Sequence, residues 1–258
     1  MTVRAKKHLG QHFLTDKNTC QKIARQYSSH EGCNKVLEIG PGMGALTEYL
    51  IADELDVWVM EIDRDSVAYL KENFPALENK IHEADFLKVD LQTLMGNEPY
   101  SVVGNFPYNI SSQILFKCLE HKNQIPEIMG MFQREVAMRI AEKPGTKQYG
   151  ILSVFMQAYY DIEYCFTVDE HVFNPPPKVK SGVIRCTRNE RKTLPCNEKL
   201  FKQVVKASFN QRRKTIRNSV KPLLGGNLID HPYMALRPEV LSVDQFIELT
   251  QMIEAASA

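Results

Sequence analysis

The sequence predicts an α/β fold, in which a doubly wound, Rossmann-like sheet is followed by a small helical domain. Between residues 35 and 181, short apolar runs such as KVLEI and DVWVMEI alternate with helical patterns such as RDSVAYLKENF. This alternation is typical of consecutive βαβ units, whose strands form a parallel sheet. After about Arg188 the pattern is helical without a strand signal, so the C-terminal part is predicted to be all helical.

A proline-rich stretch marks the transition between these two parts. Residues 174–177 read NPPP and interrupt the periodicity of the chain. Because proline and a change of pattern commonly mark a boundary, we predict a first domain over residues 1–187 and a helical domain over residues 188–258.

Capping residues predict where the first and last helices begin. Thr15 or Asp16 is suited to cap a helix that runs to about Ser28, after a basic arm that we expect to be mobile when no partner is bound. Ser242 and Gln245 have the spacing of a capping box. We therefore expect a last helix to start there.

The composition is that of an ordinary globular protein with reduced cysteines. At 258 residues and 43% hydrophobic, the chain can bury one substantial core and a smaller one. No apolar run approaches the ~18 residues of a membrane span, and the six cysteines show neither a CxxC pair nor metal-ligand spacing. We expect a cytoplasmic monomer that holds no metal ion and contacts no membrane.

Charge is distributed unevenly along the chain although the formal net charge is only +1. Residues 31–98 carry fifteen acids against five bases, whereas residues 202–221 carry seven bases and no acid. The first fifteen residues add three more bases without an acid before Asp16. This asymmetry favours a nucleic-acid partner over a solvated helix face, which usually mixes both signs. The candidate phosphate-binding residues are Arg212, Arg213, Lys214 and Arg217.

A glycine-rich turn with a downstream acid predicts a nucleoside site. Residues 38–44 read EIGPGMG where a buried strand should turn into a helix, and Gly40 and Gly42 let a ligand approach the backbone closely. Glu61 ends the next predicted strand, where its carboxylate can accept hydrogen bonds from ribose hydroxyls. A dinucleotide site or a simple tight turn also fits the glycine pattern alone.

A second acid narrows the choice of nucleoside. Asp85 follows a short predicted strand and can accept a hydrogen bond from an adenine amino group, with Phe86 beside the ring. A lone Asp is more often a turn or cap residue. The order of glycine loop, acid and acid at successive strand ends fits S-adenosylmethionine, which has no pyrophosphate to anchor.

The motif Asn105, Phe106, Pro107 and Tyr108 points to methylation of an amino nitrogen. An adenine amino group is a poor nucleophile because its lone pair is delocalised into the ring. The side-chain carbonyl of Asn105 and the backbone carbonyl of Phe106 can each accept one amino hydrogen, which favours a tetrahedral nitrogen. Pro107 fixes the backbone and Tyr108 offers a ring for stacking. A β-turn without function is the alternative interpretation of the same tetrapeptide.

This chemistry requires orientation more than a strong general base, because a methyl sulfonium is a reactive electrophile. The target base must leave its stack to enter the pocket. The substrate is therefore expected to be single-stranded, looped or flipped.

Several motifs together resemble those of one family. They are GQHFL at residues 10–14, the glycine loop, NFPY at residues 105–108, residues 173–181 and, as the most specific, FNQRRKT at residues 209–215. With these, nearly the whole chain resembles the small-subunit ribosomal RNA adenine N6,N6-dimethyltransferases, the KsgA family. The resemblance implies a class I methyltransferase domain that dimethylates two adjacent adenosines in a hairpin loop near the 3′ end of that RNA, during ribosome biogenesis.

The resemblance also assigns roles to individual positions. It implies cofactor contacts at His12, Leu14, Gly40, Glu61, Asp85 and Asn105, to which the glycine loop itself adds Gly42. It implies that Phe173 covers the face of the target base opposite Tyr108. Two departures stand out: His12 replaces a common Asn, and Phe106 replaces a commoner Leu.

Three other functions deserve comparison. A large-subunit ribosomal RNA adenine methyltransferase of the antibiotic-resistance type is disfavoured by residues 209–215. A nicotinamide dehydrogenase is disfavoured because the chain offers NFPY and no candidate hydride-transfer residues. The third is a ribosome-assembly factor that acts mainly by binding the assembling small subunit, and this role is compatible with methylation.

Overall fold

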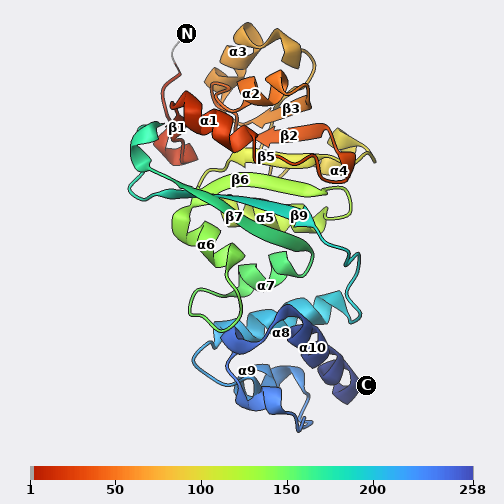
Figure 1. Ribbon diagram of the computed structural model, residues 1–258. Helices are drawn as coiled ribbons and strands as arrows, with labels where there is room; N and C mark the ends of the chain where they lie inside the picture. Colours follow the sequence, from red (N-terminus) through yellow and green to blue (C-terminus); the bar gives the residue numbers. More distant parts are fainter. Residues whose placement is uncertain (1–2, 258) are drawn as a thin grey trace. The chain divides into compact units, whose positions relative to one another are not determined.

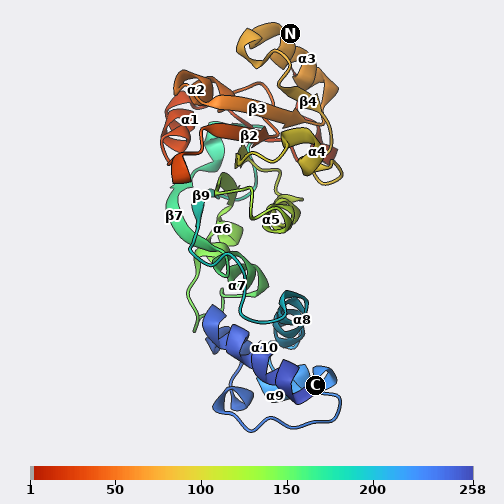
Figure 2. The same cartoon turned by 90° about the vertical axis from the view of Figure 1, so that its right-hand side faces the viewer.

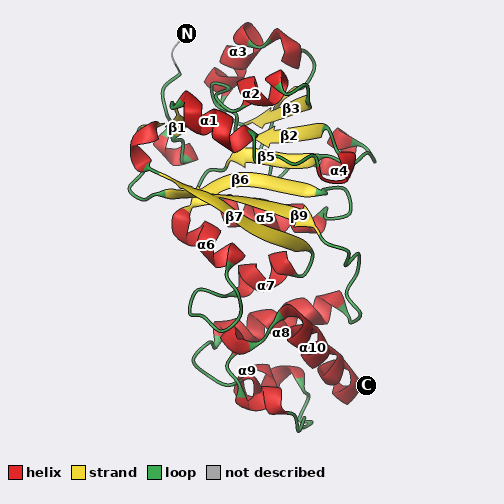
Figure 3. Ribbon diagram, viewed as in Figure 1, coloured by secondary structure: helices red, strands yellow, loops and turns green. Residues whose placement is uncertain are grey.

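The centre of the computed structural model, which describes residues 3–257, is a seven-stranded sheet with the order β4-β3-β2-β5-β6-β9-β7 (Figures 2 and 3). Its strands are β2 (Lys35–Ile39), β3 (Asp56–Glu61), β4 (Ile81–Glu83), β5 (Ser101–Asn105), β6 (Glu127–Gln133), β7 (Tyr160–Val168) and β9 (Ser181–Arg188). The pairs from β4 to β6 are parallel, whereas β9 runs antiparallel to β6. The predicted doubly wound α/β fold is confirmed, but the sheet is mixed rather than wholly parallel. The connection between β7 and β9 contains no α-helix. Strands joined in this way are normally antiparallel, because a parallel pair usually needs a helical crossover.

Helices cover both faces of this sheet. They are α1 (Lys17–Ala24), α2 (Thr47–Ala52), α3 (Arg64–Asn73), α4 (Leu91–Met95), α5 (Ser111–Glu120) and α6 (Arg134–Ala141). Helices α1 and α5 lie over opposite faces (Figures 1 and 2). Strands covered on both sides carry apolar residues at successive positions, and Val36, Val59, Val103 and Met129 are completely buried.

Helix α1 begins where the sequence predicts and ends earlier. Asp16 is its N-cap, and its carboxylate accepts a hydrogen bond from the backbone N–H of Thr19 at 2.7 Å. The helix ends at Ala24 rather than near Ser28. The backbone N–H and the hydroxyl of Ser28 both donate to the buried carboxylate of Glu127, at 2.9 and 2.8 Å. These contacts hold Ser28 in the turn after the helix.

A two-stranded antiparallel sheet ties the N-terminal segment to the chain before β9. Its strands are β1 (Phe13–Leu14) and β8 (Phe173–Asn174), and Leu14 pairs with Phe173. The short helix η1 (Lys7–Leu9) precedes β1, and η4 (Glu170–Val172) precedes β8. The remaining short helices of the sheet unit are η2 (His30–Gly32) and η3 (Pro75–Leu77).

The chain divides into two compact units. The first comprises residues up to 137 together with 161–188, and the second comprises residues 138–160 together with residues from 189 onward. Whether the predicted domains, residues 1–187 and 188–258, fold independently stays a prediction. Residues 138–160 group with the C-terminal helices because Tyr149 and Phe155 pack against Phe209 and Phe201, with ring centroids 6.2 and 6.1 Å apart.

The second unit is built from short and medium helices. They are α7 (Ile151–Gln157), α8 (Glu198–Asn210), α9 (Ile216–Val220), α10 (Val243–Ser257), η5 (Lys221–Leu223), η6 (Pro232–Ala235) and η7 (Pro238–Val240). The predicted capping box is confirmed: Gln245 N–H donates to the Ser242 hydroxyl at 3.2 Å, and Ser242 N–H donates to the Gln245 side chain at 2.8 Å. Both bonds satisfy N–H groups that a helix start leaves without partners.

Two paired glycines make room for the ring of Phe106 beneath the end of β5. Gly104 on β5 pairs with Gly130 on β6. A methyl group added at Gly130 would lie 2.2 Å from the Phe106 ring, and one at Gly104 would lie 3.0 Å from that ring and 2.6 Å from the carbonyl oxygen of Ile39. The ring also packs edge-on against Phe132, with centroids 5.1 Å apart. The side chain at position 106 therefore anchors the turn in the core.

This packing predicts that Gly130→Ala lowers the free energy of unfolding by about 1–3 kcal/mol, because overpacking displaces the Phe106 ring. Phe106→Leu, which is smaller, should relieve the clash, so the cost of Gly130→Ala should shrink in the double variant. Gly104→Ala is the matched control, because its clash with the Ile39 carbonyl persists in Phe106→Leu. Urea denaturation measures all of these costs. Additive costs for Gly130→Ala and Phe106→Leu would contradict the prediction, because they would show that the added methyl group does not clash with the Phe106 ring.

Candidate nucleoside and methyl-transfer site

A cavity of about 230 Å³ lies at the carboxyl ends of the parallel strands. Ligands of open α/β sheets bind in this position, outside the strand ends. Every residue predicted to contact the cofactor lines the cavity, namely His12, Leu14, Gly40, Gly42, Glu61, Asp85 and Asn105. So do Phe106, Pro107 and Tyr108 from the predicted methyl-transfer motif. The structure thus brings together residues that are far apart in the sequence.

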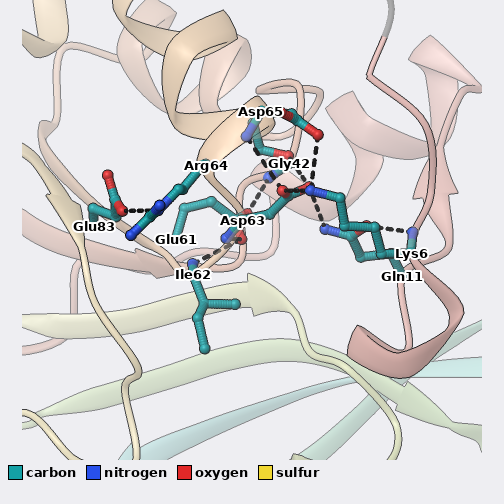
Figure 4. Close-up of polar contacts among 10 residues, drawn as sticks. Lys6, Gln11, Gly42, Glu61, Ile62, Asp63, Arg64, Asp65 and Glu83 are labelled. Atoms are coloured by element: carbon teal, nitrogen blue, oxygen red, sulfur yellow. Dashed lines mark hydrogen bonds and ion pairs between the residues drawn. The ribbon is translucent and has the colours of Figure 1, made fainter.

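The carboxylate of Glu61 organises two turns at once. Its Oε2 accepts a hydrogen bond from Gly42 N–H at 3.0 Å, and its Oε1 accepts bonds from Ile62 N–H and Asp63 N–H, both at 2.9 Å (Figure 4). Gly42 has a φ of 58°, and an added methyl group would lie 2.8 Å from the Phe13 ring. Glycine is therefore required there for two independent reasons.

Burial raises the pKa of Glu61 more than its three N–H bonds lower it. The side chain is only 4% exposed, so its lone pairs have few water partners. A carboxylate has about four lone-pair sites, and three of them already accept backbone N–H groups. One site, on Oε2, remains for a hydroxyl donor in the cavity.

The amide of Asn105 is held in one orientation by the N-terminal segment. Its Nδ2 donates to the backbone carbonyl of His12 at 2.9 Å. Because a carbonyl only accepts, the NH₂ group must face His12 and the side-chain oxygen remains an acceptor. The next residue is held as well, since Phe106 N–H donates to the carbonyl of Met131 at 3.2 Å.

The ring of Tyr108 is fixed at its hydroxyl end and stacks on an imidazole. Its hydroxyl shares a short hydrogen bond with the Ser181 hydroxyl, and burial raises its pKa. The His12 ring stacks on the Tyr108 ring, with centroids 5.7 Å apart and planes inclined by 26°. His12 Nδ1 lies 2.8 Å from the carbonyl oxygen of Pro175, so that nitrogen donates.

Asp85 and Phe173 are both predicted site residues, but only Asp85 lines the cavity. Asp85 lines the cavity, and its carboxylate accepts a hydrogen bond from Leu87 N–H at 3.0 Å. Phe173 is 4% exposed, belongs to the hydrophobic core and is not among the lining residues. Its predicted role as a cover for the target base stays a prediction. Phe173 pairs with Leu14, which does line the cavity.

Several residues around the cavity have roles that sequence reasoning missed. The basic arm is not free of acids in the fold: Lys6 pairs with Asp63 and, at 2.8 Å, with Asp65, while Gln11 Nε2 donates to Asp63 at 3.1 Å (Figure 4). Counting charges along the chain could not reveal this, because the partners are more than fifty residues apart. Lys6 precedes the GQHFL motif and Gln11 lies within it, and the sequence gives no indication that either side chain binds Asp63.

Glu38 at the end of β2 is the second buried carboxyl of the cavity. Its side chain is 2% exposed and accepts a hydrogen bond from the Thr47 hydroxyl at 2.6 Å. Burial raises its pKa to about 8, and the Thr47 bond offsets only part of this effect. The sequence places Glu38 in the glycine loop but gives no indication that it is buried.

The predicted phosphate-binding residues lie in the second unit. Arg213, Lys214 and Arg217 are exposed. Arg212 is half-buried: it donates to the carbonyl of Thr146 at 3.1 Å and lies 3.8 Å from Glu239. Arg212 thus has structural contacts that its three neighbours do not share.

No helix among residues 3–257 has both the length and the apolar character needed to cross a bilayer. Over the same residues, no group of three or more His, Cys, Asp or Glu side chains has an arrangement that could hold a metal ion.

Comparison with known proteins gives a consistent result. A family model for ribosomal RNA adenine dimethylase matches residues 2–254. A ribosomal RNA small subunit methyltransferase A from Bacteroides thetaiotaomicron is 57% identical over 256 residues, which cover 98% of this chain and 96% of the relative. A dimethyladenosine transferase from Plasmodium falciparum shares the fold with a TM-score of 0.78 at 23% identity, covering 95% of this chain and 98% of that one. The 23S rRNA methyltransferase ErmE has a TM-score of 0.66 at 28% identity, covering 93% and 99%.

The raised pKa of Glu38 predicts how stability changes with pH. Between the ordinary value of 4.5 and about 8, the unfolded chain releases the proton while the folded chain retains it. This group therefore makes stability fall as pH rises through that window. Glu38→Gln keeps an acceptor for Thr47 and removes the titration, so the variant should gain stability relative to the parent between pH 5 and pH 9.

Urea denaturation at several pH values checks this, with Glu48→Gln as the exposed control in the same segment. A stability difference between Glu38→Gln and the parent that does not vary with pH would contradict the prediction.

Proposed function

The chain belongs to the ribosomal RNA adenine dimethylase family, and on that premise we propose that it dimethylates N6 of two adjacent adenosines near the 3′ end of small-subunit ribosomal RNA. S-adenosylmethionine is its methyl donor. The observation that carries the proposal is the Asn105 amide, anchored through Nδ2 to His12 with its oxygen left as an acceptor, at the wall of the cavity that Glu61 and the glycine loop also line.

The residues of the cavity fit this donor. The nucleoside part requires a hydroxyl acceptor, and Glu61 Oε2 retains one lone-pair site after its bond from Gly42. Asp85 and Phe86 supply an acceptor and an apolar surface for an adenine ring. When bound, S-adenosylmethionine supplies an electrophilic methyl group on a positively charged sulfur.

The chain's contribution to the reaction is to prepare the accepting nitrogen. In the first transfer, Asn105 Oδ1 and the Phe106 carbonyl each accept one N6 hydrogen, which draws the nitrogen lone pair out of conjugation with the ring. The monomethylated nitrogen keeps one hydrogen, which one of these two oxygens accepts in the second transfer. Tyr108 supplies the stacking surface, and its bond to Ser181 limits rotation of the ring. After the nitrogen has been alkylated and become acidic, its proton passes to water, so orientation and electrostatics dominate.

Asn105→Ala should lower kcat at least about 10²-fold, because it removes both the acceptor and the amide that is tied to His12. The measurement is methyl transfer to immature small subunits, with S-adenosylhomocysteine binding followed by calorimetry. Asn73→Ala, an exposed asparagine at the end of α3 that does not line the cavity, is the matched control and should retain activity. Equal activities of the two variants would remove Asn105 from its proposed role.

Offering immature large subunits in the same assay separates the proposed substrate from that of the large-subunit methyltransferases. Methylation of large-subunit RNA alone would replace the proposal. Binding of small subunits without methylation by the unaltered chain would instead favour an assembly factor. We propose further that the chain acts as a cytoplasmic monomer: a ribosomal RNA substrate fits the cytoplasm, and every residue predicted to contact the cofactor lies at one cavity of the same chain.

We propose that Arg213, Lys214 and Arg217 contact RNA phosphates, supported by their exposure and by the excess of bases around them. Replacing all three by Ala should weaken RNA binding and reduce its dependence on salt, with a change in slope of about 0.7 to 0.9 per lost phosphate contact. Lys71→Ala, an exposed change on α3, is the control. A salt slope that the triple variant leaves unchanged would contradict the assignment.

A further inference from the structure

Asp63 is a buried carboxylate that the proposed reaction does not use. It is the N-cap of α3, and its side chain is completely buried. Its oxygens accept hydrogen bonds from Asp65 N–H and the Ser66 hydroxyl, both at 3.2 Å. They also bind two side chains from the N-terminal segment, Lys6 and Gln11 (Figure 4). A capping role alone requires only the contacts within α3.

The N-terminal partners belong to a short segment, residues 6–12, which we call the strap. Lys6 and Gln11 are themselves joined, because Lys6 N–H donates to the Gln11 side-chain oxygen at 2.7 Å. Between them, Gly10 caps the C-terminus of η1; its φ is 68°, and an added methyl group there would lie 2.5 Å from the Asn109 side chain. The strap is thus a closed turn in which Lys6 and Gln11 bind each other and both bind Asp63.

The strap also forms part of the cavity wall. Residues 8–12 line it, and the His12 carbonyl is the acceptor that orients the Asn105 amide. On the other side, Asp63 N–H donates to Glu61, the carboxylate that holds the glycine loop. Asp63 is therefore the point where the strap joins the turn that binds the nucleoside.

We propose that Asp63 is a positioning residue, which clasps Lys6 and Gln11 and thereby holds the strap in the position that completes the cofactor cavity and orients Asn105. The inference rests on the proposed function, since it assigns a role within that site. Asp63 touches neither the base nor the methyl donor in this scheme. It acts through the strap on one side and through Glu61 on the other.

The charge state of the clasp agrees with this role. Burial alone would raise the pKa of Asp63, but the bonds from Lys6 and Gln11 outweigh it and lower the pKa below its ordinary value. The carboxylate is ionised at neutral pH and pairs with the ammonium group of Lys6. Removing one partner of such a pair leaves a charge without compensation, so the strap should detach rather than adjust.

The test uses variants on both sides of the clasp. Lys6→Met removes the cation from the strap and leaves the α3 cap untouched, while Asp63→Asn keeps an acceptor for the cap, because Asn and Asp cap helices about equally well. Lys7→Met is the matched control, since Lys7 is exposed and adjacent. The full chain is titrated with S-adenosylhomocysteine by calorimetry, and hydrogen exchange is followed at the amides of residues 6–12.

Both clasp variants should weaken S-adenosylhomocysteine binding about tenfold and speed strap exchange. They should also raise KM for S-adenosylmethionine and lower kcat, because Asn105 loses its anchor. The double variant should cost less than the sum of the two single variants, since both changes break the contact between Lys6 and Asp63. Lys7→Met should bind like the parent.

Parental affinity and strap exchange in Lys6→Met and Asp63→Asn would overturn the inference, even if their stability fell. This result differs from failure of the proposed function, in which the unaltered chain itself would not bind S-adenosylhomocysteine. Weaker binding in Asp63→Asn with parental binding in Lys6→Met would also overturn it, because the effect would then come from the α3 cap and not from the strap.

Discussion

Burial of the Glu61 carboxylate is the constraint on which the geometry of the site depends. A carboxylate removed from water is tolerated only when its lone pairs are used. Here the donors are backbone N–H groups from two different turns, Gly42 on one side and Ile62 with Asp63 on the other. One side chain therefore fixes the shape of both turns. The residue expected to contact the ligand is first of all the residue that builds the binding surface.

The methyl-transfer turn, residues 105–108, is fixed in a different way, by a side chain packed in the core. The ring of Phe106 is 1% exposed and occupies the space left by Gly104 and Gly130, which face each other across two strands. A ring in the core cannot shift without a large packing cost. The backbone from Asn105 to Pro107, which presents the carbonyl groups, is consequently held in place. Phe106, which is larger than the commoner Leu, requires the space that Gly104 and Gly130 leave.

The sequence was most informative where the signal was local. The strand and helix rhythm, the Ser242 and Gln245 cap, and the position of each acid at a strand end follow from short-range patterns, and the structure brings these acids to one cavity. Contacts between distant segments were not predictable. The sequence suggests an N-terminal arm whose bases have no acidic partner, whereas Lys6 pairs with Asp63 in the structure. The antiparallel direction of β9 and the grouping of residues 138–160 with the C-terminal helices likewise depend on tertiary packing.

The departure at position 12 has a physical explanation in the contact that Asn105 makes. Asn105 binds the backbone carbonyl of residue 12, which every amino acid provides. The side chain is thus free to differ from the common Asn without loss of that anchor. In this chain the imidazole takes on contacts of its own, since its Nδ1 donates to the Pro175 carbonyl and its ring stacks on Tyr108. The imidazole therefore links the residue before β1 to the segment after β8, while the orientation of the Asn105 amide does not depend on this link.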